Sequence, residues 1–294
     1  MPRLERTLAR WRHRLMRRRP VRDVALALDG AGPRYLIALP AEPDRVLDEL
    51  PSCRSPAGTQ TDDLRMPYWA TPWASGVALA RAIWQHAAAL AGRRVAELGC
   101  GLGVTATAAA DAGARLLAID CFGEALAYCR YNVARNTARV PCTRLVDWRL
   151  PAGRATLAAE GPFDLLLAAD VLYEAEDIAP LLELVPQLLP AGGELWLAEP
   201  GRATSRRFVA AARQAGWHAS TQVMAAAWPD AGVDEVQVFL HRYRFDPAGR
   251  PGAIRAATAS ARDGAGRSPS TPAFPLRARN GYGAGAGSSA RLST

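Results

Sequence analysis

The chain has 294 residues, of which 49% are hydrophobic and 22% are charged, and its formal net charge is +8. It holds no apolar run near the roughly 18 residues needed to cross a bilayer, and no apolar signal segment opens it. Its five Cys residues lack C-x-x-C spacing and its four His residues are dispersed, which argues against a disulfide framework and a zinc site. We therefore expect a cytoplasmic protein with no membrane contact and no metal site.

The positive charge lies at the two ends of the chain. Residues 1–20 hold eight Arg and one Glu, residues 247–294 hold seven Arg and one Asp, and residues 21–246 hold 21 Arg and 26 acidic residues. The predicted core is therefore acidic, which argues mildly against nucleic-acid binding by this core and mildly for a cationic substrate. The chain contains no Lys, which we attribute to base composition.

The composition divides the chain into three parts. Residues 1–21 form a basic N-terminal arm that we interpret as a solvated segment, while contact with RNA, anionic lipid or an acidic protein, or a role as an Arg-rich transit peptide, stays open. Residues 247–294 are rich in Gly, Ala, Ser, Pro and Arg and are predicted to be disordered. Residues 22–246 are expected to form a single domain, because strand and helix patterns alternate along them.

In chain order, the first predicted element is a hairpin at residues 22–40, outside the main sheet. The strands that follow are expected at 94–98, 115–119, 142–146, 163–169, 193–198, 218–225 and 235–243. The helices are expected at 75–91, 103–112, 123–136, 176–189 and 203–215. Such an alternation predicts an α/β fold, in which ligands bind at the carboxyl ends of the strands.

The most informative stretch is Val95-Ala-Glu97-Leu-Gly99-Cys100-Gly101-Leu-Gly103, a buried strand that ends in alternating glycines before an Ala-rich helix. Glycines let the backbone approach a ligand, and the first free N–H groups of the helix point into the same space. The spacing is G-x-G-x-G and not the dinucleotide pattern G-x-G-x-x-G. Glu97 is poorly placed for a pyrophosphate and well placed for a cationic amino group, such as that of S-adenosylmethionine. We therefore expect Glu97, Gly99, Cys100, Gly101 and Gly103 to bind this cofactor.

A second acidic residue supports a nucleoside-containing ligand. Asp120 ends the second strand, 21 residues after Gly99, near the spacing at which an acid reaches ribose hydroxyls. Nicotinamide cofactors and S-adenosylmethionine both need such an acid, so Asp120 does not separate them.

Three further segments are expected at the same sheet edge. Asp170-Val-Leu-Tyr173 follows the fourth strand, in a loop that we expect to face the methyl group of S-adenosylmethionine. Asp147 and Trp148 end the third strand, where an acid and an aromatic plane can hold an adenine. Residues 67–73, Pro-Tyr-Trp-Ala-Thr-Pro-Trp, precede the helix that leads into the glycine loop and are expected to fold over the cofactor as a lid.

At these residues the chain resembles the class I, seven-strand methyltransferases that use S-adenosylmethionine, and within them the protein-lysine branch with a D-x-x-Y motif. The segments 67–80, 170–173 and 199–202 resemble the lysine methyltransferases of the electron-transfer-flavoprotein beta subunit, and bacterial relatives often carry a nicotinamide N-methylase label. The likeness spans about residues 60–245 and implies a Rossmann-like, seven-stranded, mostly parallel sheet with an antiparallel last strand. It also implies that Asp170 and Tyr173 position the substrate amine, and that the cofactor is lined by Trp73, Glu97, Gly99, Gly101, Asp120, Trp148 and Ala169.

The resulting prediction is an S-adenosylmethionine-dependent N-methyltransferase that acts on a lysine of a protein, with an electron-transfer-flavoprotein subunit as the partner that the resemblance suggests. Two alternatives stay open: a small-molecule, nicotinamide-like N-methyltransferase, and a module that binds the cofactor without turnover. A closed cap over Tyr173 favours a small molecule and an open acidic rim favours a protein. The sequence names neither the substrate nor the number of methyl groups added.

Overall fold

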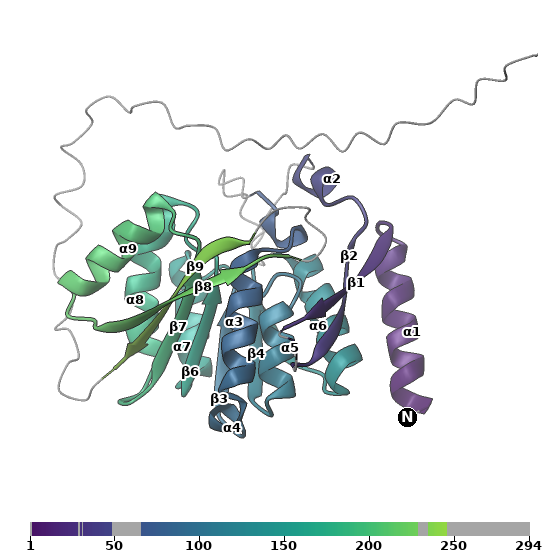
Figure 1. Ribbon diagram of the computed structural model, residues 1–294, viewed down its shortest axis with the longest axis horizontal. Helices are drawn as coiled ribbons and strands as arrows, with labels where there is room; N and C mark the ends of the chain where they lie inside the picture. The colour runs from purple at the N-terminus through teal and green to yellow at the C-terminus, as the bar shows by residue number, and fades with distance from the viewer. Residues whose placement is uncertain (1, 29, 31, 49–65, 229–234, 246–294) are drawn as a thin grey trace, which may run out of the picture. The chain divides into compact units, whose positions relative to one another are not determined.

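The computed structural model describes residues 2–28, 30, 32–48, 66–228 and 235–245 (Figure 1). The contacts divide the chain into residues 1–253 and residues 254–294. The second unit lies outside the described residues, as do Cys53 and the predicted tail 247–294.

The centre of the fold is a sheet with the strand order β5-β4-β3-β6-β7-β9-β8. Its first five strands in this order are parallel, whereas β9 is antiparallel to both β7 and β8. The strands are β3 (Arg94–Leu98), β4 (Arg115–Asp120), β5 (Cys142–Leu145), β6 (Leu165–Ala169), β7 (Glu194–Glu199), β8 (Ala219–Ala226) and β9 (Val236–Arg244). Each agrees with a predicted strand within two residues, and the predicted α/β class is confirmed.

Helices cover both faces of this sheet (Figure 1). One face is covered by α3 (Ala74–Gln85), α5 (Val104–Asp111) and α6 (Gly123–Thr137), which pack in sequence against one another. The other face is covered by α7 (Pro151–Glu160), α8 (Ile178–Leu188) and α9 (Ala203–Gln214). A short 3-10 turn, η2 (Ala175–Asp177), leads into α8.

The two hydrophobic cores follow from the alternation of side chains along each strand. In β6, Leu165 and Leu167 join the core beneath α3, α5 and α6. Leu166 and Ala168 join the core beneath α7, α8 and α9. Both faces of β6 are thus buried, which explains why this strand is a continuous apolar run in the sequence.

The N-terminal residues form a helix and a hairpin outside the main sheet. Strands β1 (Val21–Ala27) and β2 (Arg34–Pro40) pair antiparallel, as predicted for residues 22–40. The basic arm forms helix α1 (Pro2–Met16), which packs on α6, and α2 (Pro43–Asp48) follows the hairpin. The interpretation of the arm as a solvated segment was wrong for this helix, because Leu15 is 3% exposed and joins the core.

Besides α1 and α2, which were not predicted as helices, the helices of the main domain differ from the prediction at two places. The helix predicted at residues 75–91 is divided into α3 and the one-turn helix α4 (Ala87–Leu90), with the break at His86. There the ring Nδ1 of His86 lies 2.9 Å from the carbonyl oxygen of Ala82, within reach of a hydrogen bond. Helix α7 was not predicted, because its first three residues, Pro-Ala-Gly, are typical of a turn.

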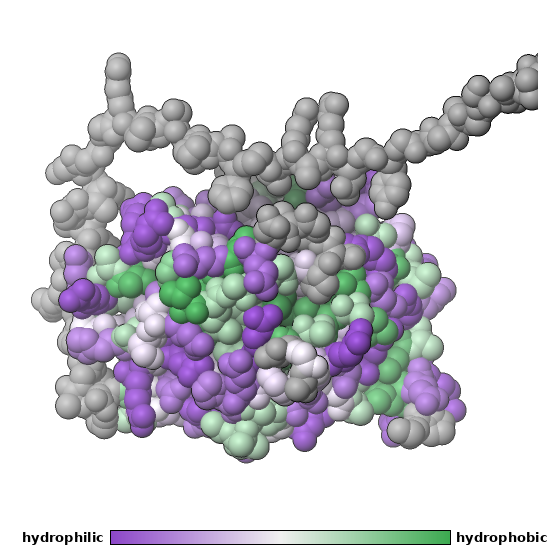
Figure 2. All heavy atoms as spheres, in the orientation of Figure 1, coloured by the Kyte–Doolittle hydropathy of each residue, from purple (hydrophilic) through white to green (hydrophobic). Residues whose placement is uncertain are grey.

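None of the helices in the described residues is long and apolar enough to cross a membrane. Figure 2 shows hydrophilic and hydrophobic residues interspersed over the face turned toward the viewer.

Candidate active site

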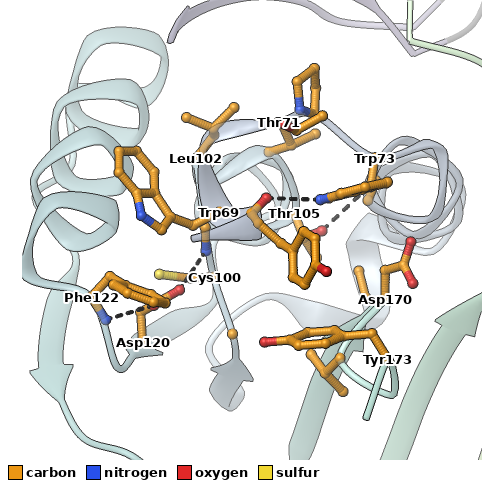
Figure 3. A pocket seen from close by; sticks show the side chains of 18 of the residues that line it. Trp69, Thr71, Trp73, Cys100, Leu102, Thr105, Asp120, Phe122, Asp170 and Tyr173 are labelled. Carbon is orange, nitrogen blue, oxygen red and sulfur yellow. Dashed lines mark hydrogen bonds between the residues drawn. The ribbon is translucent and has the colours of Figure 1, made fainter. Parts of the chain in front are cut away.

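A pocket that is partly open to solvent lies at the carboxyl end of the parallel strands. The loops after β3, β4 and β6 line it, together with the segment before α3. In Figure 3, Asp120, Cys100 and Phe122 lie on one side of this pocket, and Trp73, Asp170 and Tyr173 lie on the other. The pocket therefore has two sides with different chemistry, which we call the glycine-loop side and the aromatic side.

The glycine loop takes backbone conformations that L side chains rarely adopt. Gly99 has φ +71°, and a Cβ there would lie 2.9 Å from Cγ1 of Val171. Gly103 has φ +80°, and a Cβ there would lie 2.8 Å from Cα of Cys129 in α6. A substitution at Gly103 would have to displace helix backbone, so the close packing of loop and helix requires glycine at this position.

Glu97 lies beneath the loop and is 2% exposed. Its Oε2 atom has no hydrogen-bond partner among the described residues. Burial raises the pKa of Glu97 well above its usual range; the nearby Thr105 hydroxyl and Ala106 amide oppose this, and the charge of Asp120 adds to it. A buried acceptor without a donor costs free energy, so Oε2 of Glu97 can accept a hydrogen bond from a donor that the described residues do not supply.

Asp120 ends β4 and accepts two backbone hydrogen bonds. The amide of Gly101 donates to Oδ2 and the amide of Phe122 donates to Oδ1, both at 2.9 Å. These bonds fix the carboxylate at the pocket wall and tie the glycine loop to the end of β4.

Three aromatic rings build the other side. Tyr68, in the 3-10 turn η1 (Tyr68–Ala70), packs edge to face against Trp73 and Tyr173, with ring centroids 6.2 and 5.0 Å apart. The indole N–H of Trp73 donates to the carbonyl oxygen of Tyr68 at 3.0 Å. Trp73 is nevertheless 37% exposed, so its ring lies at the mouth of the pocket.

Asp170 follows β6 in the left-handed region, at φ 54°, which is uncommon for a residue other than glycine. Its amide donates to the carbonyl oxygen of Ala198 in β7. Nε and Nη2 of Arg202 donate to Oδ1 and Oδ2 of Asp170 at 3.0 and 3.2 Å. Burial raises the pKa of Asp170, and the paired Arg202 opposes part of that rise. The acid of the aromatic side is therefore already paired with a cation.

A buried network holds the turn that carries Arg202. Oε2 of Glu199 accepts the amide of Gly201 at 2.5 Å, and Oε1 lies 3.1 Å from Nε2 of His241 in β9. The other ring nitrogen of His241 lies 2.8 Å from the hydroxyl of Thr221. Burial raises the pKa of Glu199, but the bonds from His241 and Gly201 outweigh it and lower the pKa overall.

Most of the predicted site residues come together in this pocket. Nine of them line it: Trp73, Gly99, Cys100, Gly101, Asp120, Trp148, Ala169, Asp170 and Tyr173. Glu97 and Gly103 are not among the lining residues, since Glu97 is buried in β3 and Gly103 precedes α5. Asp147, expected beside an adenine, is instead paired with Arg149 at 2.5 Å.

Other residues at the pocket wall were not predicted from the sequence, among them Thr105, Cys121 and Phe122. Their signal was positional, because each directly follows the glycine loop or the end of a strand. The pairing of Arg202 with Asp170 was also missed. The two residues are 32 positions apart and meet only because β6 and β7 are neighbours.

The strand order, the antiparallel β9 and the pocket at the carboxyl edge define the fold as Rossmann-like, with a seven-stranded sheet. A solved protein with a similar fold, the 16S rRNA methyltransferase RsmC of T. thermophilus in complex with AdoMet and guanosine, matches with a TM-score of 0.51 at 13% identity, over 76% of this chain and 50% of that one. A family model described as lysine methyltransferase matches residues 67–214. The chain belongs to this lysine methyltransferase family.

Two curated relatives show the range of acceptors in similar proteins. The chain is 34% identical over 142 residues to an electron transfer flavoprotein beta subunit lysine methyltransferase of Xenopus laevis, covering 47% of this chain and 54% of that protein. It is 29% identical over 124 residues to the histone-arginine methyltransferase METTL23 of Mus musculus, covering 42% and 48%. The chain thus spans about half the length of the curated relatives it matches.

Proposed function

We propose that this protein is an S-adenosylmethionine-dependent N-methyltransferase that modifies a lysine side chain of a protein substrate. One observation carries the proposal. A single pocket joins a glycine loop and a strand-end acid, suited to the cofactor, to an acid among three aromatic rings, suited to a cationic side chain. The cytoplasm remains the predicted compartment.

The glycine-loop side fits S-adenosylmethionine. The buried Oε2 atom of Glu97 lacks a donor among the described residues, and the amino group of the cofactor would supply one. Asp120 would accept from the ribose hydroxyls, and Trp148, which also lines the pocket, would pack against the adenine. When bound, the cofactor supplies an electrophilic methyl group on a positively charged sulfur.

The aromatic side supports an amine as the acceptor. The lysine nitrogen forms its bond to the methyl carbon as the carbon–sulfur bond breaks, so this nitrogen must first lose its proton. The pKa of lysine is ordinarily about 10.4, and an apolar environment lowers it. The rings of Tyr68, Trp73 and Tyr173 provide such an environment, and Asp170 would orient the incoming ammonium. Positioning the nitrogen near the methyl group supplies most of the acceleration.

The choice of lysine in a protein is supported by the family model and by the Xenopus laevis relative. The beta subunit of an electron-transfer flavoprotein is accordingly our first candidate substrate. The similarity to a histone-arginine methyltransferase makes arginine the alternative that the experiment must separate.

The proposal is tested with the purified full-length chain, S-adenosylmethionine carrying a labelled methyl group, and a lysate separated into protein and small-molecule fractions. We expect label in a protein band and mass spectrometry to locate it on lysine. Label only in the small-molecule fraction, or only on arginine, would contradict the proposed acceptor. Binding of S-adenosylhomocysteine without transfer to any fraction would make the protein a binding module.

A further inference from the structure

Arg202 occupies the charged part of the aromatic side. Its guanidinium makes two parallel hydrogen bonds to the carboxylate of Asp170, whose side chain is 6% exposed. The guanidinium carbon also lies 5.7 Å from the centroid of the Trp73 ring, within the range of a cation–π contact. Arg202 thus has the two contacts, a buried acid and an aromatic face, that a lysine ammonium would need at this position.

The two partners differ in how firmly they are held. Asp170 is fixed by the bond from its amide to the carbonyl oxygen of Ala198 and is almost fully buried. Arg202 is attached through the turn that Glu199 and Gly201 stabilise, but its own side chain is 36% exposed. The guanidinium therefore has solvent to move into, whereas the carboxylate does not.

Asp170 needs a cation whenever its buried carboxylate is ionised. A buried carboxylate without a partner is strongly unfavourable, and removing one member of a buried pair commonly costs several kcal/mol. Two cations competing for one buried carboxylate would repel each other as well. Exchange of one cation for another avoids both costs, because Asp170 keeps a cationic partner and the released guanidinium is hydrated.

We propose that Arg202 is the resident cation of the acceptor site, which the substrate ammonium must displace from Asp170 and Trp73 before methyl transfer. The proposal rests on the proposed function and adds a specificity-determining residue to it. Neutral and anionic side chains cannot replace a guanidinium at a buried carboxylate, so Arg202 restricts the site to cationic acceptors. Arg202 acts on the substrate by competition and is not itself a catalytic residue.

The first test measures binding of n-butylammonium, which carries the ammonium and the four carbons of a lysine side chain. Its dissociation constant is determined by NMR titration with S-adenosylhomocysteine present. In Arg202→Met we expect about tenfold tighter binding, because the site is no longer occupied for most of the time by its own guanidinium. Adding Asp170→Asn should abolish the gain. Arg207→Met is the matched control, since Arg207 is an exposed arginine of α9, the helix that directly follows Arg202, and lies outside the pocket lining.

This binding measurement does not depend on turnover. If no acceptor in a lysate is methylated, the proposed function fails, while tighter binding in Arg202→Met would still support the exchange. Unchanged or weaker binding in Arg202→Met, with transfer to protein intact in the wild type, would overturn the exchange and leave the proposed function standing.

A second test uses the absence of lysine from the chain. Arg202→Lys introduces a single lysine at the position of the resident cation, so its methylation can be read from intact mass after incubation with S-adenosylmethionine. We expect methyl groups to be added to this introduced lysine, and the addition to be lost when Asp170→Asn is combined with it. An Arg202→Lys variant of unchanged mass, together with weaker n-butylammonium binding in Arg202→Met, would assign Arg202 a purely structural role.

Discussion

Asp170 is the residue on which the proposed acceptor site, on the aromatic side of the pocket, depends. It is almost fully buried, adopts a left-handed backbone conformation and is paired with Arg202. A non-glycine residue in this conformation costs roughly 1–3 kcal/mol and persists where the surrounding structure enforces it. Here the bond from its amide to Ala198 and the bonds from Arg202 provide that enforcement.

Asp170→Asn is expected to lower methyl transfer on the order of 100-fold, because the variant keeps the size of the side chain and loses the charge that orients the ammonium. Cofactor affinity should change much less. Both quantities are measured on one preparation, by initial rates and by calorimetric titration with S-adenosylhomocysteine. Equal losses would make Asp170 a cofactor ligand, and full activity would remove the D-x-x-Y motif from the mechanism.

Asp120 is expected to act on the cofactor alone. Asp120→Ala should weaken binding of S-adenosylhomocysteine by about 1–3 kcal/mol, because ribose hydroxyls would be buried without an acceptor. Asp164→Ala is the matched control, since Asp164 accepts from the amide of Arg94 at the opposite end of the neighbouring strands. Similar losses in both variants would show that the effect is a general loss of stability.

At the scale of elements, helix α1 packs on the rest of the domain through both apolar and charged side chains. Leu15 is buried, Arg12 pairs with Asp23 at 2.9 Å, and Arg130 of α6 lies 5.1 Å from the ring centroid of Trp11. Beyond the helix, Arg19 makes two hydrogen bonds to Glu124. The basic arm therefore contributes to the fold.

Leu15→Ala is expected to lower the free energy of unfolding by about 2–4 kcal/mol, the range for a buried Leu whose removal leaves a cavity. The neighbouring Met16 is 54% exposed, so Met16→Ala should stay within about 0.5 kcal/mol of the wild type. Urea unfolding measures both. A Leu15→Ala variant as stable as Met16→Ala would mean that α1 is not packed on the domain in solution.

Strands β4, β6 and β7 were predictable because each is a short, mostly apolar run, and β3 because it leads directly into the glycine loop. Helix α1 was predictable as well, since Leu4, Leu8, Trp11 and Leu15 recur at helical spacing. The eight arginines of residues 1–20 instead favoured the interpretation as a solvated segment. In α7, Pro151 occupies the first turn, where proline is favourable because no amide hydrogen bond is needed. The sequence Pro-Ala-Gly also suits a turn, so local propensity did not distinguish a helix from a turn here.

The site was predictable where its residues are near in sequence to strand ends, and unpredictable where it depends on tertiary pairing. Glu97, Asp120 and Asp170 could be assigned to one edge because parallel strands end together. No local pattern indicates that Arg202 reaches Asp170. Their contact needs β6 beside β7, a left-handed Asp170 and the turn held by Glu199.

At the scale of the molecule, the burial of Glu97 makes the stability of the fold depend on pH. Its pKa in the folded protein is raised well above the ordinary 4.5, so between these two values the folded state holds more protons than the unfolded chain. The free energy of unfolding therefore falls as pH rises through that window. When Glu97 is ionised, its buried carboxylate destabilises the fold, and under the proposed function the amino group of the cofactor would neutralise this charge.

Glu97→Gln should remove this pH dependence. The stability of the variant relative to the wild type is expected to increase with pH from about 5 to about 8, while cofactor affinity falls. Urea unfolding of both proteins across this range, without cofactor, provides the measurement. A stability difference that stays constant with pH would show that Glu97 has an ordinary pKa in the fold.

The position of β9 between β7 and β8 has a consequence for synthesis on the ribosome. Strand β7 is synthesised before β8 and β9, and β9, which covers its outer edge, is the last strand of the described residues. Until residues 236–244 have been made, the nascent polypeptide presents Leu195, Trp196 and Leu197 beside a row of unpaired backbone groups, the arrangement that promotes edge-to-edge association. Translation halted before Val236 would release a polypeptide that chaperones must retain, although every residue of its glycine loop is already in place.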